Sequence, residues 1–234
     1  MAARAPEEHP MACWGILPFF LAGSLVLGTA ACFRVQPLVG TVPPAVESVE
    51  GYASWRLARD GVSSKSRFSF LIVLPDRGRI EISDPLNRTA ARLVLEGETA
   101  YLVLPGKHVY WEAGRSEVMT RLLGFDITPA ELSSLLSGRA EELSGWRLEA
   151  DDGGRFVGGR REGLEFSVRE FIDGGRIPRT VSFSNGTDQG SLRIIRLRFN
   201  QPPREGALRL SFLEDERFRA VGWSEIEKLL KNED

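Results

Sequence analysis

The sequence is poor in the residues on which catalysis, metal binding and disulfide cross-linking depend. Its 234 residues include two Cys and two His, and both cysteines, Cys13 and Cys32, lie near the N-terminus. The body of the chain therefore has no Cys for a disulfide framework or a zinc site. It contains neither the G-x-S-x-G motif of serine hydrolases nor the H-E-x-x-H motif of zinc peptidases. We therefore expect a protein that is not an enzyme and that uses no metal or cofactor.

A few polar residues could still carry chemistry, but each has a simpler interpretation. His108 stands at the start of a predicted strand, where a lone His is more often a surface or hydrogen-bonding residue than a base. Asp151 and Asp152 precede two glycines and could bind calcium weakly, although a hairpin turn explains the same pattern. Glu141 and Glu142 fall on a connection between a helix and a strand, where they are expected to be solvated.

The chain also has no large excess of positive or negative charge. The 30 Lys and Arg residues nearly balance the 32 Asp and Glu residues, which gives a net charge of −2. A nearly neutral chain lacks the basic footprint of a duplex-binding protein, so we expect no nucleic-acid partner. Arg residues alternate with apolar residues in "RIIRLRF" (193–199), with Ile195, Leu197 and Phe199 expected on one face. This alternation indicates a strand with one solvated face.

The N-terminus carries the signal for the compartment. Residues 10–33 contain no charged side chain, and the apolar stretch ends in "GTAAC", small residues followed by Cys32. This order is typical of a bacterial lipoprotein leader, in which Cys32 becomes the lipid-modified N-terminus. An uncleaved anchor and an ordinary cleaved signal are the alternatives, and all three place the body outside the cytoplasm. We expect a signal peptide at 1–31, a lipidated tether at 32–50 and a folded domain at 51–234.

The body of the chain reads as a series of antiparallel strands. Two-residue alternation recurs from residue 52 onward, for instance at Phe68 and Phe70, and in "ALRLSF" with Leu208, Leu210 and Phe212 on one side. Turn signals such as "PDRG" and "SNGTDQG" separate the runs. The pattern predicts roughly ten strands, enough for a barrel or a sandwich.

Residues 121–138, "RLLGFDITPAELSSLLSG", interrupt this pattern with helical spacing. Thr128, Pro129 and Glu131 form a capping box that opens a helix, and Gly138 ends it. A second helix is expected in "WSEIEKLLKN" (223–232), with Ser224 as its cap. The early strands, such as "ARLVLE", are apolar on both faces, so another element must cover them. The stretch 121–138 is the best candidate, either as a lid over a concave sheet or as plain core filling.

Three stretches resemble the LolA/LolB lipoprotein-localisation family, and most closely its outer-membrane receptors. They are "GRIEISDPLNRTAARLVLEGETAYLV" (78–103), the helical stretch 121–138, and "SGWRLE" (144–149), in the order in which the family has them. The resemblance implies a mainly β protein, with a curved antiparallel sheet that forms an unclosed half-barrel under a lid of short helices. It also implies an apolar cavity that binds the acyl chains of lipoproteins and passes them to the outer membrane.

The resemblance assigns roles to individual residues. Cys32 would carry the lipid anchor that holds a monomer on the periplasmic side of the outer membrane. Leu86 matches a leucine that projects from a loop and acts in membrane delivery, although it could also fold back on the sheet as a turn residue. A periplasmic LolA-like carrier would supply the cargo. The residues expected to form the acyl-chain cavity and its lid are Phe68, Phe70, Leu122, Leu123, Phe125, Leu132, Leu135, Leu136 and Trp146.

A second hypothesis uses the same fold without lipid carriage. An envelope lipoprotein of this kind could bind a protein partner or sense lipid, with a cavity filled by its own side chains. An empty cavity that opens at the lid favours carriage, whereas a filled one favours the structural role.

Overall fold

The computed structural model describes residues 41–231, apart from residues 60, 85 and 87. The expected signal peptide, Cys32 and residues 33–40 of the expected tether lie outside the described residues. The described residues form one compact unit with its own hydrophobic core. Among the described residues, no helix is both long enough and apolar enough to span a membrane.

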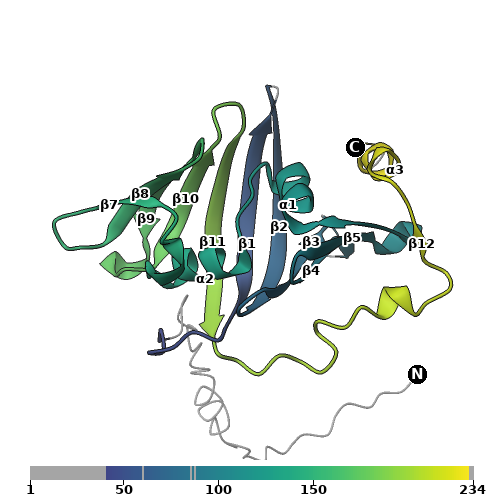
Figure 1. The fold of residues 1–234 in the computed structure, drawn as a ribbon, viewed down its shortest axis with the longest axis horizontal. Helices are drawn as coiled ribbons and strands as arrows, with labels where there is room; N and C mark the ends of the chain where they lie inside the picture. The colour runs from purple at the N-terminus through teal and green to yellow at the C-terminus, as the bar shows by residue number, and fades with distance from the viewer. Residues whose placement is uncertain (1–40, 60, 85, 87, 232–234) are drawn as a thin grey trace, which may run out of the picture. The chain divides into compact units, whose positions relative to one another are not determined.

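One sheet of twelve strands forms the body of the protein (Figure 1). Its spatial order is β12-β6-β5-β4-β3-β2-β1-β11-β10-β9-β8-β7, and neighbours are antiparallel except for the β12–β6 pair. The sheet does not close on itself, so the expectation of a mainly β, unclosed half-barrel is confirmed. The strands are β1 (Ser48–Arg59), β2 (Val62–Val73), β3 (Arg77–Ser83), β4 (Thr89–Glu96), β5 (Thr99–Leu104), β6 (Val109–Gly114), β7 (Arg147–Ala150), β8 (Phe156–Arg161), β9 (Leu164–Phe171), β10 (Pro178–Ser184), β11 (Gln189–Phe199) and β12 (Arg219–Ala220).

A β-bulge in β11 corrects one expected face. The pairing of β1 with β11 shifts between Tyr52 and Ala53, which face Arg196 and Ile194 respectively. Ile195 is therefore the extra residue, and its side chain is 43% exposed, whereas Ile194 is 2% exposed. The prediction that Ile195 shares the buried face of Leu197 was wrong, because a bulge reverses the alternation on one side of it.

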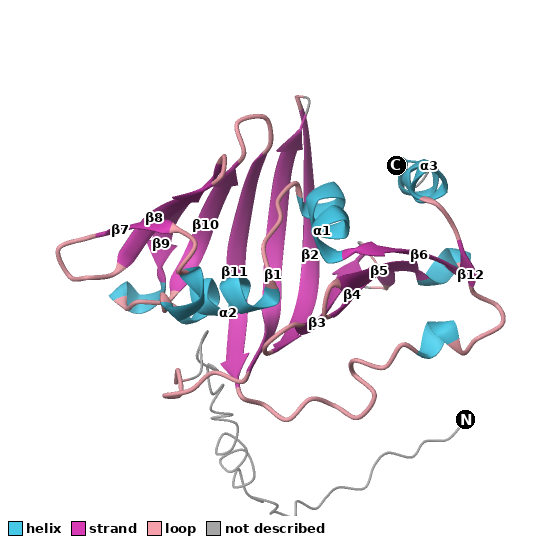
Figure 2. Ribbon diagram, in the orientation of Figure 1, coloured by secondary structure: helices cyan, strands magenta, loops and turns pink. Residues whose placement is uncertain are grey.

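Three α-helices lie on the concave side of the sheet: α1 (Arg115–Leu123), α2 (Pro129–Ser137) and α3 (Trp223–Lys231) (Figure 2). The predicted capping box of α2 is confirmed, since the Thr128 side chain accepts from the Glu131 N–H and the Glu131 carboxylate accepts from the Thr128 N–H. Gly138 ends α2 in the left-handed conformation. α3 begins at Trp223, so Ser224 lies inside the helix and is not its cap. Four short 3₁₀ helices complete the regular structure: η1 (Pro105–Lys107), η2 (Glu141–Leu143), η3 (Ile172–Gly174) and η4 (Ser211–Leu213).

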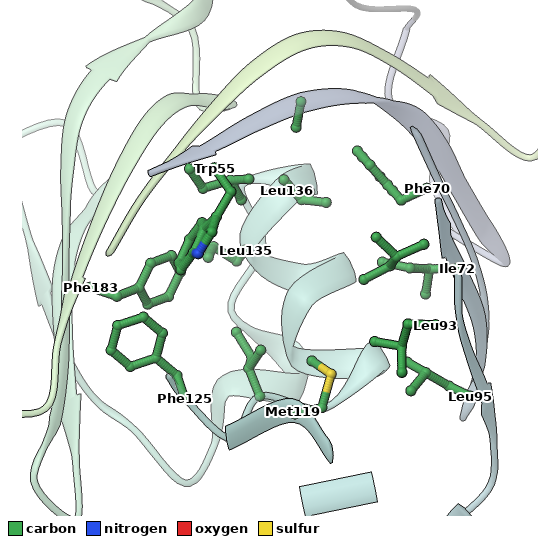
Figure 3. Close-up of a cluster of buried hydrophobic side chains, with 14 of the residues drawn as sticks. Trp55, Phe70, Ile72, Leu93, Leu95, Met119, Phe125, Leu135, Leu136 and Phe183 are labelled. Carbon is green, nitrogen blue, oxygen red and sulfur yellow. The ribbon is translucent and has the colours of Figure 1, made fainter. Parts of the chain in front are cut away.

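The main core fills the space between the concave face of the sheet and the helices (Figure 3). Phe70, Ile72, Leu93 and Leu95 line one side of it, and Trp55, Phe125 and Phe183 gather on the other. Met119 of α1 and Leu135 and Leu136 of α2 reach the core from the helices. These three side chains are each 1% exposed, so both helices are packed into the core.

A second, smaller core lies on the opposite face of β4 and β5. Phe212 covers Val94 and Val103 there, and all three side chains are buried. The expected strand through Leu208, Leu210 and Phe212 does not form, because this segment makes turns and the 3₁₀ helix η4 instead. Its apolar side chains cover the convex face of other strands. The cover expected for the doubly apolar strands therefore comes from the helices on the concave face and from this segment on the convex face.

Candidate functional site

The candidate site is a small cavity between the concave face of the sheet and the helices α1 and α2. Every lining residue is apolar, and the lining comes from both halves of the sheet and from the lid. The residues are Trp55, Phe68, Phe70, Ile80, Leu123, Phe125, Ile127, Leu132, Leu136, Phe183 and Leu192. A surface of this kind can bind a hydrocarbon chain but offers almost no directional polar contact.

The aromatic wall of the cavity depends on a glycine in β11. The rings of Trp55 and Phe125 meet edge to face with their centroids 5.8 Å apart, and Phe125 and Phe183 lie 5.5 Å apart. A Cβ atom at Gly190 would come within 2.5 Å of the Trp55 ring and within 2.6 Å of the Phe125 ring. Gly190 therefore leaves the space into which these two rings pack.

The cavity is nearly filled in this structure. Its volume is about 40 Å³, whereas pockets that enclose drug-sized ligands usually measure about 300–1,000 Å³. A long acyl chain can enter only if the lid or the aromatic side chains move outward. The indole N–H of Trp55 is buried and has no hydrogen-bond partner among the described residues. It is thus an unpaired donor beside an apolar cavity.

A buried polar cluster fastens α2 to the sheet. The Glu131 carboxylate accepts a hydrogen bond from the Trp146 indole at 2.9 Å and forms an ion pair with Arg161 at the end of β8. The Arg161 guanidinium also donates to the Asp126 carbonyl at 2.9 Å and stacks on the Trp146 ring at 4.8 Å. Because Glu131 is 6% exposed, this cluster is largely shielded from water. Loss of either charged partner would therefore leave the other charge buried without compensation.

A second polar cluster holds the end of α1. Arg59, the last residue of β1, donates to Asp188 in the β10–β11 turn at 2.9 Å and to the carbonyls of Thr120 and Arg121 at 3.4 and 3.3 Å. The Asn185 amide, in the same turn, donates to the Gly124 carbonyl at 3.0 Å. The lid is thus held by polar contacts at its rim, while the space beneath it is apolar.

Six of the nine residues expected in the cavity and lid do line the cavity. They are Phe68, Phe70, Leu123, Phe125, Leu132 and Leu136. Leu122 packs against the core elsewhere, Leu135 is buried beside the cavity, and Trp146 belongs to the polar cluster around Glu131. The cavity is also lined by five residues that were not predicted from the sequence: Trp55, Ile80, Ile127, Phe183 and Leu192. Alternation marks most of them as strand residues, but alternation alone does not tell which inward residues lie beneath the lid.

Leu86 projects into solvent. Its side chain is 73% exposed in the loop between β3 and β4. Asp84 pins this loop, since its carboxylate accepts from the Arg88 N–H at 2.8 Å and from the Arg88 guanidinium at 2.7 Å. The Arg88 backbone hydrogen bond, followed by its side chain, lowers the pKa of Asp84 below its ordinary value. Leu86 therefore does not fold back on the sheet as a turn residue would.

Among the described residues, no group of three or more His, Cys, Asp or Glu side chains is placed to hold a metal ion. The fold is an unclosed antiparallel half-barrel with an apolar cavity under a lid of short helices. The chain belongs to the family of the outer membrane lipoprotein LolB, which it matches over residues 48–201.

Solved structures are similar to this chain at low sequence identity. A putative outer membrane lipoprotein-sorting protein domain from Vibrio parahaemolyticus has a TM-score of 0.51 at 12% identity, covering 72% of this chain and 92% of that one. A DUF1329 family protein from Desulfovibrio piger has a TM-score of 0.50 at 10% identity, with the same coverage, 72% and 92%. A LolA superfamily protein from Nitrosomonas europaea has a TM-score of 0.47 at 14% identity and covers 68% and 89%. No curated protein matches the sequence.

Proposed function

We propose that this protein is an outer-membrane lipoprotein that receives the acyl chains of other lipoproteins in the cavity and passes them to the outer membrane. The observation that carries the proposal is the cavity, whose lining is apolar throughout and lies directly beneath two short helices. Burying one methylene group contributes about 0.8 kcal/mol, so a sixteen-carbon chain contributes on the order of 12 kcal/mol at most. Such a chain does not cross water without a carrier.

Binding requires the lid to open, and its attachments fit that requirement. α1 and α2 each contain nine residues, and both are held by polar contacts as well as by side chains packed into the core. When the lid opens, water can solvate the released charges, and an acyl chain that enters can cover the apolar side chains that are exposed. Lid opening would then enlarge the cavity between Leu132 and Leu136 of α2 and the sheet. We infer that cargo enters there.

The unpaired indole N–H of Trp55 supports a ligand with a carbonyl group. A buried donor without a partner destabilises a protein by about 1–3 kcal/mol. The ester or amide carbonyl of an acylated cysteine can accept this hydrogen bond. Trp55→Phe is therefore expected to weaken the binding of ester-linked lipids more than that of ether-linked lipids, which lack the carbonyl.

Anchoring and delivery complete the proposal. Cys32 would carry the lipid anchor and hold a monomer on the periplasmic face of the outer membrane, and a periplasmic LolA-like carrier would bring the cargo. Leu86, exposed on its pinned loop, would enter the outer membrane when chains are released. Directional transfer without ATP requires only that each successive site binds the chains more tightly.

Displacement of an apolar dye tests the binding step. The unacylated chain from residue 33 onward is loaded with an environment-sensitive dye and titrated with a triacylated lipopeptide, and then with a diacyl phospholipid. We expect the lipopeptide to displace the dye, and Leu123→Gln to weaken this displacement by about tenfold, because it places an amide in the cavity wall. Leu122→Gln is the matched control, since Leu122 is partly buried on the same helix but does not line the cavity. Equal behaviour of the two variants would contradict a role for this cavity.

Delivery is tested separately with Leu86→Glu. This variant should displace the dye as the parent protein does but transfer less lipopeptide to liposomes. Unchanged transfer would remove Leu86 from the proposal and leave the binding step intact.

A second candidate function is favoured by the small volume of the cavity. At about 40 Å³ the space is largely filled by side chains, as expected of an envelope lipoprotein that binds a protein partner or senses lipid. If neither lipid displaces the dye, or if no dye binds, this alternative replaces lipid carriage.

A further inference from the structure

The convex face of the three central strands is strongly basic. Along the described length of β11, β1 and β2, the outward positions include one carboxylate, Glu50, which pairs with Arg198 at 3.5 Å. The basic residues on the same strands that face outward are Arg56, Lys65, Arg67, Arg193, Arg196 and Arg198. The protein as a whole carries a net charge of −2, so this face concentrates positive charge that is balanced elsewhere.

Two of these bases face each other directly. In the β1–β2 pairing Arg56 lies opposite Lys65, and Ser54, the neighbouring outward position of β1, lies between Arg67 on β2 and Arg193 on β11. Side chains directly opposite each other on antiparallel strands have Cβ atoms about 4.5–5.5 Å apart, and like charges there are destabilising. An arrangement that lowers the stability of the free protein indicates that something else neutralises it.

A carboxylate on the neighbouring strand β3 is already occupied. Glu81 of the neighbouring strand β3 binds the guanidinium groups of Arg79 and Arg92. Burial would raise the pKa of Glu81, but these two arginines outweigh it and hold the pKa below its ordinary value. Glu81 is therefore committed as an anion to its own partners. Within the described part of the chain, Arg56, Lys65, Arg67 and Arg193 make no ion pair.

Exposed apolar side chains lie among these bases. Among the described residues, Tyr52 of β1 and Ile195 of β11 are exposed large hydrophobic residues on this face. They are 55% and 43% exposed beside the β-bulge. A hollow of about 530 Å³ opens next to Tyr52. Bases mixed with exposed apolar and tyrosine side chains favour the interface of a bilayer over a purely acidic surface.

We propose that this face, the convex surface of β11, β1 and β2, docks on a bilayer of anionic phospholipids. The bases would contact the headgroup phosphates, and Tyr52 and Ile195 would reach the boundary with the acyl chains. The inference rests on the proposed function in one respect, namely that the protein works at a membrane. The helical lid lies on the opposite face of the sheet, so docking in this way leaves the lid free to meet a carrier (Figure 1).

The test measures vesicle binding without an anchor or cargo. The unacylated chain from residue 33 onward is mixed with vesicles of phosphatidylethanolamine alone or with added phosphatidylglycerol, and the bound fraction is measured by flotation. We expect binding only to the vesicles with phosphatidylglycerol, and release at high salt. Each base near an anionic surface contributes about fivefold in affinity, so Lys65→Gln/Arg67→Gln should lose about 25-fold.

The control removes the same charge from other places. Arg147→Gln/Lys228→Gln changes one exposed base on β7 and one on α3, and it should bind as the parent protein does, to within about twofold. Soluble glycerophosphoglycerol should not compete, because the site requires a surface and not a single phosphate. Circular dichroism shows that each variant is folded before binding is compared.

The outcomes separate this inference from the proposed function. Equal losses in the two double variants, or no preference of the parent protein for anionic vesicles, would overturn the docking face and would favour an acidic protein as its partner. Dye displacement by lipopeptide does not involve this face and should be unchanged in Lys65→Gln/Arg67→Gln. If displacement fails while anionic vesicles still bind, lipid carriage is wrong and the docking face stands.

Discussion

Two regions of the same sheet bury their faces differently. Strands β4 and β5 are buried on both faces, since Leu93 and Leu102 point to the main core and Val94 and Val103 pack under Phe212. Strands β11, β1 and β2 are buried on the concave face only, and their convex face carries Arg and Ser. The difference appears in the sequence as continuous apolar runs in β4 and β5, and as Arg and Ser residues between the apolar positions over much of β11, β1 and β2.

The cover of the first region comes from a segment outside the family match. The match ends at residue 201, and the chain from there to η4 crosses the convex face of β4 and β5 before adding β12 to the edge of the sheet. α3 then returns to the concave side, where the Trp223 ring packs against the Trp111 ring in a tilted arrangement, with the ring centroids 4.9 Å apart. This segment protects one end of the sheet on both faces and at its edge, while the convex face of the strands in the other region stays exposed to solvent.

Removing the cover should have the largest effect. Phe212→Ala deletes the buried ring that packs on Val94 and Val103, so we expect it to lower the free energy of unfolding by about 3–5 kcal/mol. Leu213→Ala is the control, because Leu213 is 43% exposed and should change stability by about 0.5 kcal/mol or less. Urea unfolding of both variants measures the difference, and similar midpoints would show that the convex cover adds little.

The second-largest loss of stability is expected when the attachment of the lid helix α2 to the sheet is removed. Glu131→Ala leaves the Arg161 guanidinium without its buried partner and also removes the capping box, so a loss of about 3 kcal/mol is expected. Glu141→Ala, an exposed neighbour on η2, should be nearly neutral. Faster exchange of the α2 amide hydrogens in Glu131→Ala alone would locate the loss in the lid. Unchanged exchange would mean that this cluster does not hold α2.

Local features of the chain were predictable from the sequence, and long-range ones were not. The boundaries of α2 follow from Thr128, Glu131 and Gly138, which act within one or two turns of the helix. By contrast, Ile195 was assigned to the wrong face because a bulge depends on the partner strand, and Phe212 was assigned to a strand because its neighbours alternate. Its true partners, Val94 and Val103, lie more than a hundred residues away along the chain.

The candidate site was predicted only in part, because some of its residues carry a local signal and others come together only through long-range contacts. The lid residues were found because they form a helix inside a β protein, whereas Trp55 and Phe183 resemble any inward strand residue. The two residues come together beneath the lid because β1 and β10 both pair with β11, a long-range pairing that the local pattern does not reveal. Gly190, which makes room for the Trp55 ring, has no signal in the sequence beyond a turn-like glycine.

A smaller loss of stability is expected for Gly190→Ala. A methyl group there would press on the Trp55 and Phe125 rings, and overpacking of this kind lowers stability by about 1–3 kcal/mol. The displaced rings should also fill the cavity, so Gly190→Ala is expected to bind less of the apolar dye. Gly145→Ala is the control, since the nearest atom to its added Cβ lies 3.8 Å away. Unchanged dye binding in Gly190→Ala would show that the aromatic wall can shift without closing the cavity.

The smallest expected effect is an increase in stability, and it concerns the solvated convex face. Lys65→Thr removes one of two bases that face each other, so we expect the free energy of unfolding to rise by about 0.2–1 kcal/mol at low salt. A double-mutant cycle with Arg56→Thr isolates the repulsion between the two side chains, and 1 M salt should abolish it because screening then acts over about 3 Å. A gain that persists at 1 M salt would come from the strand preference of Thr. A coupling that disappears with salt would mean that the free protein holds two repelling charges together, as a face that meets an anionic surface requires.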